Sequence, residues 1–579
     1  MKKDSGRTSQ DIYRFYILAS FMVVVFLLYL LRLFVLQVQS FAYYTALASE
    51  QYSTKKILQP SRGEIKVADR NSLDLFTVAA VTKKKLAFVD AQEVVDQNLV
   101  ARTLKEVLEV DEGEVLERIL DRSRRYIVIK KQISDDQAKA LQDRNVIGIH
   151  FDEESVRVYP ENSFLSHVLG FVGYKGDIRQ GLYGIEESQE GELRGESGSL
   201  DQEKDVHGTW ILSGRREIKP VKDGDTLVLT VDRSIQLKAE QILRETVDSN
   251  EADSGSIVAM NPKTGAILAM ANYPDFNPNE YNKVEDPSVF VNDATLSNYE
   301  PGSIFKPLTM AAAINEGKVT QDTTYIDTGS VEIDGYKIQN SDKEAHGRQT
   351  MTQVLEESLN TGAIFAKESI GNQMFFDYVK KFGFGAATGI ELRESKGDLD
   401  NLKANIKVNF HTASFGQGIA VTPIQMVQAY GALANKGVLM RPFIIQSRIT
   451  SDGTTFTTRP TEVGKVISEQ TASLVSGMLV NVVEKGHGKR AQVAGFWVAG
   501  KTGTAQVPKK DGRGYDETNN IGSFIGYAPV ENPQFVALVR VNHPRNVRFA
   551  ESTAAPAFGE LAKYILSYLN VLPTRQIAK

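Results

Sequence analysis

The sequence predicts an α+β protein with one membrane helix near its N-terminus, in which helices pack against an antiparallel sheet. The first observation is an uncharged apolar run from Phe15 to Leu31. The second is an alternation of short β-like runs and amphipathic helical stretches from Ser40 to about Pro220, and the third is a mixture of strands and helices after it. A chain of 579 residues predicts two or three domains. The expected divisions are a tail (1–14), an anchor (15–36), a non-catalytic region (37–222) and a C-terminal domain (223–579).

The apolar run near the N-terminus is long enough for a membrane helix, which needs about 20 residues. Lys2, Lys3, Arg7 and Arg14 precede it, so the positive-inside rule places the short N-terminal tail in the cytoplasm. The alternative is a cleavable signal peptide, and residues 46–48 do have the small-x-small pattern of a cleavage site. Those residues lie well beyond the run, which exceeds the roughly 7–15 apolar residues of a signal peptide. We therefore expect a retained anchor, with the rest of the chain outside the cytoplasm.

The region from 37 to 222 is predicted to be a scaffold, because no cluster of nucleophilic or titratable residues in it suggests chemistry. Arg157 and Tyr159 are expected to brace strand junctions, and the acidic stretch 186–198 is expected to be a solvated loop. Apolar spacing also predicts individual elements in this region. They are strands at 85–89 and 125–129 and helices at 99–108 and 115–119.

The C-terminal domain is predicted to begin after a turn at residues 222–225. Its patterns alternate between the two-residue period of strands and the longer period of helices. The expected elements are a strand (226–231), a helix (232–243), a hairpin (256–272), two strands (496–506 and 523–528) and a last helix (558–569), with further helices carrying the first two motifs described below.

Composition excludes several classes of function. The 42% hydrophobic and 24% charged content is that of a globular protein. A formal net charge of -5 gives no indication of a basic nucleic-acid-binding surface. Seven histidines and no cysteine argue against a zinc or redox site, so we expect no metal and no cofactor. Absence of cysteine also suits an oxidising compartment.

Three short motifs outline an active-site serine. They are Ser303-Ile304-Phe305-Lys306, Ser358-Leu359-Asn360 and Lys501-Thr502-Gly503, in this order. A Pro-Gly turn signal precedes Ser303, so this serine is expected to open a helix. Residues three apart share a helix face, which predicts that the Ser303 hydroxyl lies beside the Lys306 amine as nucleophile and candidate base.

The chain also contains chance matches to these motifs. Residues 53–56 read S-x-x-K, and residues 263–265 read K-T-G at the expected tip of a hairpin. A single motif is therefore weak evidence. What favours the functional interpretation is the ordered set in matching surroundings, because context confirms a motif.

With these motifs the chain resembles the class B, monofunctional penicillin-binding proteins, which are D,D-transpeptidases that cross-link peptidoglycan. The resemblance covers nearly the whole chain. Further matching segments are 62–65, 69–71, 157–160 with His167, 170–173, 184–186, 299–306, 414–418, 422–423 and 524–529.

The resemblance implies a penicillin-binding/β-lactamase-like transpeptidase domain above an elongated pedestal, and a role for each motif residue. Ser303 would attack the carbonyl of a D-Ala-D-Ala bond, and Lys306 would be the base. This role requires a lowered pKa, which burial or the charge of Lys501 could supply. Alternatively, Lys306 only hydrogen-bonds Ser303 and another group takes the proton.

The other two motifs would bind substrate and complete proton transfer. The resemblance implies that Ser358 relays a proton to the leaving amine and that Asn360 binds the substrate backbone. Thr502 and Thr504 would hold the terminal carboxylate with Lys501, while Gly503 would let the strand approach the substrate closely. The oxyanion hole would consist of the backbone N–H groups of Ser303 and Thr504.

The second motif and its surroundings argue against a β-lactamase. Leu359 stands where β-lactamases have Asp in the second motif. The E-x-x-L-N pattern of a class A lactamase occurs here only at 356–360, where it overlaps the second motif itself. We therefore expect slow deacylation and stable β-lactam adducts, with a D-Ala-D-Ala carboxypeptidase side activity possible.

The resemblance also implies partners and a location in the bacterial cytoplasmic membrane. Expected partners are stem peptides on lipid-linked glycan strands, β-lactams, other division or elongation membrane proteins, and a membrane glycosyltransferase of the shape, elongation, division and sporulation group. The compact length, the run at 414–418 and the lack of an added C-terminal domain favour a division role over elongation. The competing hypothesis is a scaffold that activates such a glycosyltransferase.

Overall fold

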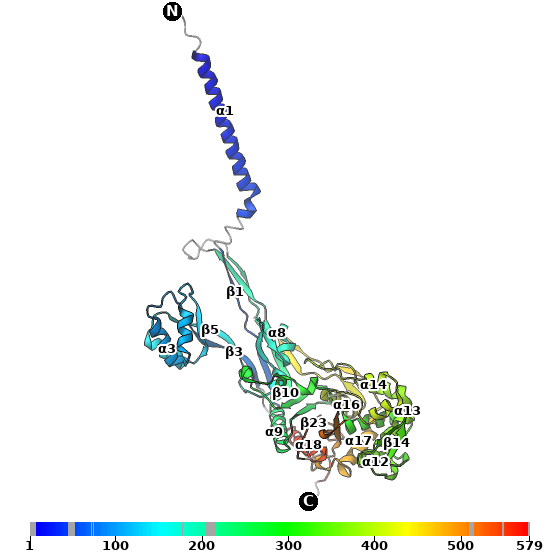
Figure 1. The fold of residues 1–579 in the computed structure, drawn as a ribbon. Helices are drawn as coiled ribbons and strands as arrows, with labels where there is room; N and C mark the ends of the chain where they lie inside the picture. Colours follow the sequence, from blue (N-terminus) through cyan, green and yellow to red (C-terminus); the bar gives the residue numbers. More distant parts are fainter. Residues whose placement is uncertain are drawn as a thin grey trace, which may run out of the picture. The chain divides into compact units, whose positions relative to one another are not determined.

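The computed structural model describes residues 7–44, 53–70, 72, 74–176, 178–203, 216–508, 515–546 and 549–576 (Figure 1). The chain divides into two compact units. One contains Met1–Pro60 and Glu196–Asp223, and the other contains Ser61–Gly195 and Gly224–Lys579.

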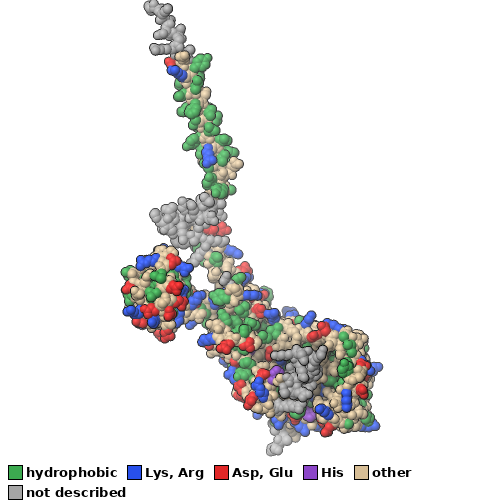
Figure 2. Space-filling model, in the orientation of Figure 1, with side chains coloured by type: hydrophobic (Ala, Val, Ile, Leu, Met, Phe, Trp, Pro, Cys, Tyr) green, Lys and Arg blue, Asp and Glu red, His purple; other side chains and the backbone are tan. Residues whose placement is uncertain are grey.

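The first unit contains the apolar N-terminal helix. Helix α1 (Arg7–Phe34) continues into a short π-helix (Val35–Gln39). Among the described residues, Gln10–Gln39 is the segment long and apolar enough to cross a membrane, with a mean hydropathy of 2.5. Figure 2 shows hydrophobic side chains over most of its surface. The helix fits a single-pass membrane anchor, whereas Lys2 and Lys3 of the expected tail lie outside the described residues.

A small antiparallel sheet completes the described part of the first unit. Its strand order is β1-β8-β9, and Ser53 begins β1. The expected cleavage-like residues 46–48 lie outside the described residues. The strands are β1 (Ser53–Leu58), β8 (Gly198–Glu203) and β9 (Arg216–Lys219).

The second unit begins with a lobe built on one long strand. Strand β3 (Leu75–Val89) pairs with β2 (Ile65–Ala68) near its start, and with β4 (Ile127–Ile133) and β5 (Ile149–Val158) further along. Helices α3 (Gln97–Leu108), α4 (Glu112–Ile119) and α5 (Asp135–Arg144) bury their apolar faces against these strands. The two predicted helices are thus confirmed, and the strand predicted at 125–129 begins two residues later.

The same sheet continues into the C-terminal part of the chain. Strand β2 pairs in parallel with β10 (Thr226–Asp232), and β10 pairs with β18 (Ile445–Ile449). Strands from both sides of residue 223 therefore share one sheet.

A buried ion pair braces the junction between β5 and the segment after it. Glu186 is fully buried, and its carboxylate accepts hydrogen bonds from Arg157 Nε at 2.6 Å and Arg62 Nε at 2.7 Å. Tyr159 adds a hydroxyl at 3.1 Å, and Arg157 also donates to the carbonyl of Gly63. The bracing role of Arg157 and Tyr159 is confirmed.

The expectation of a solvated loop at 186–198 is wrong. Residues there form helices α7 (Gly184–Ser188) and α8 (Glu190–Arg194). The carboxylate of Glu186 can be buried because two guanidinium groups compensate its charge.

The centre of the second unit is a five-stranded antiparallel sheet of order β12-β11-β23-β22-β21. Alternate residues of β11 enter different cores. Ile257 packs with helices α9 and α18, whereas Val258 packs with α11, α16 and α17 on the other face. The predicted hairpin and the two predicted strands all lie in this sheet, and the predicted last helix packs against it. The bounds are β11 (Ser254–Met260), β12 (Ile267–Tyr273), β21 (Ala499–Pro508), β22 (Tyr515–Ala528), β23 (Phe535–Asn542), α9 (Arg233–Ser249), α11 (Lys306–Asn315), α16 (Pro423–Ala434), α17 (Glu469–Glu484) and α18 (Ala554–Tyr568).

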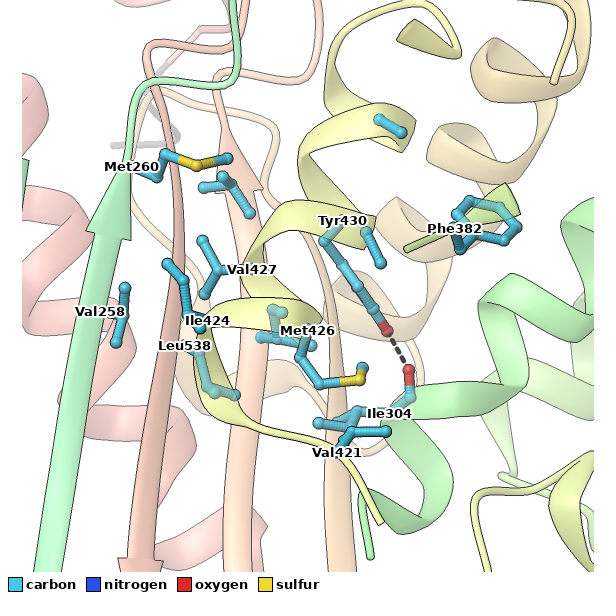
Figure 3. Close-up of a cluster of buried hydrophobic side chains, with 14 of the residues drawn as sticks. Val258, Met260, Ile304, Phe382, Val421, Ile424, Met426, Val427, Tyr430 and Leu538 are labelled. Atoms are coloured by element: carbon cyan, nitrogen blue, oxygen red, sulfur yellow. Dashed lines mark hydrogen bonds between the residues drawn. The ribbon is translucent and has the colours of Figure 1, made fainter. Parts of the chain in front are cut away.

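The core between this sheet and α16 supports the first motif. Figure 3 shows side chains of α16 packed between strands that carry Val258 and Leu538 and the segment that carries Ile304. The buried hydroxyl of Tyr430 donates a hydrogen bond of 2.6 Å to the carbonyl oxygen of Ile304, the residue after Ser303. This hydrogen bond from α16 therefore holds the backbone next to the candidate nucleophile.

Candidate active site

Ser303 lies in a short 3₁₀ helix, Gly302–Phe305, that leads directly into α11. Gly302 has a φ of +59°, a conformation that glycine adopts without strain, and its N–H donates to the carbonyl of Gly416. Ser303 is partly exposed, whereas the two residues after it and Lys306 are buried. The prediction that the chain turns helical at Ser303 is confirmed.

Two lysine amines meet at the hydroxyl of Ser358. Lys306 Nζ donates to Ser358 Oγ at 3.1 Å and also to the Ser358 carbonyl. Lys501 Nζ donates to the same Oγ at 3.1 Å. Because a hydroxyl has two acceptor lone pairs and one proton, these two bonds leave the proton of Ser358 available to a third group. The three motifs are thus brought together around one side chain.

Both amines are removed from solvent, and this changes their acidity. Lys306 is 1% exposed and Lys501 is fully buried. Burial, and next the positive charge of Lys501, hold the pKa of Lys306 well below its ordinary value. Burial lowers the pKa of Lys501 to about 7. A neutral amine is therefore accessible at this site near neutral pH.

Ser358 has an unusual backbone conformation. It lies in a turn between α12 (Met351–Glu356) and α13 (Asn360–Lys381), with a φ of +59°. The motif was expected on a helix, and the structure places only Asn360 in one, as the first residue of α13. A non-glycine residue in the left-handed region persists only where its surroundings hold it, and such residues cluster at functional sites.

The third motif lies on β21, at the edge of the central sheet. An added Cβ at Gly503 would lie 2.9 Å from Ile304 Cγ2 and 3.1 Å from the carbonyl oxygen of Pro301. The glycine also lets the 3₁₀ helix of Ser303 pack closely against the strand at this point.

The remaining predicted residues have these contacts. Thr502 is 7% exposed, and Thr504 Oγ1 accepts a 3.5 Å hydrogen bond from the N–H of Ala550. Asn360 Nδ2 donates to the carbonyl of Gln339 at 2.8 Å. The hydrogen bonds that the structure gives to the Lys306 amine go to Ser358, so the expected direct Ser303–Lys306 contact is not among the described interactions.

The structure adds residues that the motifs did not reveal. Asn340 and Asp327 contact the start of α13, and Tyr430 contacts the segment of Ser303. No local pattern marks them, since these three contacts join residues 20, 34 and 126 positions apart in the sequence. Within the described part of the chain, no group of His, Cys, Asp or Glu is arranged to hold a metal ion.

Comparison of the chain with known proteins identifies its family. Residues 255–563 match the penicillin binding protein transpeptidase domain, and residues 57–229 match the penicillin-binding protein dimerisation domain. Stage V sporulation protein D of Bacillus subtilis is 37% identical over 96% of this chain and 86% of its own length. The peptidoglycan D,D-transpeptidase FtsI of Escherichia coli is 28% identical over 90% of this chain and 86% of its own length.

A solved structure shares the fold. The penicillin binding protein 3 of Mycobacterium tuberculosis, in complex with aztreonam, is 26% identical and covers 90% of this chain and all of its own, with a TM-score of 0.69. Sequence motifs, fold and relatives agree. The chain belongs to the class B penicillin-binding proteins, the family of serine-type peptidoglycan D,D-transpeptidases.

Proposed function

We propose that this protein cross-links peptidoglycan stem peptides through an acyl-enzyme on Ser303. The observation that carries the assignment is the meeting of two buried amines, Lys306 and Lys501, at the Ser358 hydroxyl. Lys306 begins α11 directly after the 3₁₀ helix that contains Ser303. This arrangement supplies a nucleophile, a group able to take its proton, and a second hydroxyl able to pass a proton on.

In the first half of the reaction, Ser303 Oγ attacks the carbonyl carbon of the D-Ala-D-Ala bond and its proton passes to neutral Lys306. The N–H groups of Ser303 and Thr504 stabilise the oxyanion. The C–N bond then breaks as Ser358 passes its proton to the leaving D-Ala amine and takes the proton from Lys306, which becomes neutral again. In the second half, an amine of a neighbouring stem peptide attacks the ester carbonyl and gives up a proton to Lys306. The new amide forms, the ester C–O bond breaks, and Ser303 leaves with that proton.

The other motif residues bind the substrate. Asn360 holds the peptide backbone, and the hydroxyls of Thr502 and Thr504 hold its terminal carboxylate. Residues 223–579 form the transpeptidase domain, and residues 37–222 form a non-catalytic pedestal. The anchor keeps the tail in the cytoplasm and the catalytic domain outside, where glycan strands and a membrane glycosyltransferase partner are available.

The test is covalent labelling of the full-length protein with a fluorescent penicillin. We expect a persistent adduct in wild type and in Ser53→Ala, which removes the chance S-x-x-K match, and none in Ser303→Ala. The binding of aztreonam by the Mycobacterium tuberculosis relative supports this expectation. An adduct that survives in Ser303→Ala would reject this serine, and hydrolysis within seconds would favour a lactamase.

For the cellular role, we propose septal synthesis at division, with synthesis during sporulation as a second candidate. The sporulation candidate rests on the 37% identity to stage V sporulation protein D, compared with 28% to FtsI. A fluorescent fusion expressed from its own promoter distinguishes them. A division enzyme is present at the septum of growing cells, whereas a sporulation enzyme is present only after sporulation begins.

A further inference from the structure

A small β-rich segment lies beside the second motif and contacts the start of α13. Strands β13 (Thr324–Asp327) and β16 (Gly347–Thr350) pair with each other, and β14 (Ser330–Ile333) pairs with β15 (Tyr336–Gln339). In Figure 1 this segment lies next to α12 and α13. Ile333 packs against Ala363 and Ile364 of α13, so the segment and the helix share a core.

The segment supplies the N-terminal cap of α13. The residue in the capping position, Leu359, has no side chain that can accept a hydrogen bond, so the first N–H groups of the helix need another acceptor. Asn340 provides it. Its Oδ1 accepts from the N–H of Asn360 at 2.9 Å and from that of Thr361 at 3.2 Å.

Asp327 determines which way the Asn340 amide faces. The carboxylate of Asp327 accepts from Asn340 Nδ2 at 2.9 Å and from the Thr361 hydroxyl at 2.7 Å. Both residues are buried, at 2% and 3% exposure. Because an ionised carboxylate only accepts hydrogen bonds, the NH₂ group of Asn340 has to face Asp327, and Oδ1 then faces the helix.

We propose that Asn340 and Asp327 are positioning residues for the second motif, which rests on the proposed function of Ser358 and Asn360. The backbone at Asn360 is held by Asn340, and the side chain of Asn360 is held by the carbonyl of Gln339. Ser358 lies two residues earlier in the left-handed conformation, so its place between the two amines depends on where α13 begins.

The test measures the rate constant of penicillin acylation and, separately, the fraction of protein that becomes acylated at completion. Asn340→Leu keeps the size of the side chain and removes the acceptor. We expect acylation to slow about 10- to 100-fold, because small displacements of catalytic groups have effects of that order. The acylated fraction should stay near that of wild type. Ser134→Ala, which removes the cap of α5 far along the chain, is the matched control and should acylate at the wild-type rate.

A swap of the two polar groups tests the orientation argument. Asn340→Asp places two carboxylates against each other and should also slow acylation. Adding Asp327→Asn removes one of the two facing negative charges, so the double variant should acylate faster than Asn340→Asp alone. Equal rates in these two variants would contradict a role for the Asp327 charge.

The outcomes separate this inference from the proposed function. Ser303-dependent labelling of wild type, with an unchanged rate in Asn340→Leu, would overturn the positioning role alone. A lower acylated fraction of Asn340→Leu at an unchanged rate constant would also overturn the positioning role, because it would mean that Asn340 contributes only to folding. Absence of Ser303-dependent labelling in wild type would overturn both.

Discussion

At the scale of residues, the site is defined by what burial does to two amines. A lysine in water holds its proton at neutral pH and cannot act as a base. Lys306 and Lys501 lie in a site with no carboxylate in hydrogen-bonding contact with either amine among the described interactions. Burial therefore lowers the pKa of both amines, and the positive charge of Lys501 lowers the pKa of Lys306 further.

The first prediction concerns the pH dependence of acylation. Raising the pH removes protons from the amines, so the acylation rate constant of wild type should rise with pH well below the ordinary pKa of a lysine. Lys501→Gln removes the charge that lowers the pKa of Lys306, so the rise in the residual activity should move to higher pH. The measurement is the rate of penicillin acylation between about pH 5.5 and 9.5, a range that extends from below the pKa of Lys501, about 7, towards the ordinary value of a lysine. A rise at the same pH in wild type and in Lys501→Gln would contradict the role of the Lys501 charge.

At the scale of elements, periodicity predicted several strands and helices close to where the structure has them, because this signal is local. The hairpin β11–β12, the strand β21 and the last helix α18 are found close to their predicted bounds. Long-range pairing was not predictable. An acidic stretch is usually solvated, and Glu186 is buried only because Arg62 and Arg157, 124 and 29 residues away, reach it. Asn340 likewise caps a helix 20 residues later in the sequence.

The second prediction concerns helix α16, which holds the segment of Ser303 through one hydroxyl. Tyr430→Phe removes the hydrogen bond to Ile304 and should lower the free energy of unfolding by about 1 kcal/mol, the usual loss for one hydrogen bond. Because that bond fixes the backbone beside Ser303, acylation should slow as well. Both are measurable on the full-length protein, by thermal unfolding and by labelling rate.

Tyr527→Phe is the matched control for this prediction. Tyr527 is also fully buried, and its hydroxyl makes a hydrogen bond of the same length, 2.6 Å, to Ser476. The two variants should lose similar stability, but only Tyr430→Phe should acylate slowly. Equal acylation rates would mean that the contact with Ile304 contributes stability alone.

At the scale of the whole molecule, the N-terminal and C-terminal parts of the second unit are joined by backbone pairing. Strands β2 and β3 from the first 90 residues continue the sheet of β10 and β18 from the C-terminal part. Shared ladder hydrogen bonds resist relative movement more than a polar domain interface does. The ion pair between Arg233 and Glu161, at 2.7 Å, adds to this connection.

The last prediction concerns the orientation of the chain in the membrane. The natural sequence contains no cysteine, so a single introduced cysteine reports its own side of the bilayer. Glu531 is exposed in the turn between β22 and β23, and Ser9 lies at the start of α1. With basic residues before the apolar helix, Glu531→Cys should react with a membrane-impermeant maleimide in intact spheroplasts. Ser9→Cys should react only after lysis, and labelling of both before lysis, or of Ser9→Cys alone, would contradict a cytoplasmic tail. Retained penicillin labelling of each variant shows that the protein under test is folded.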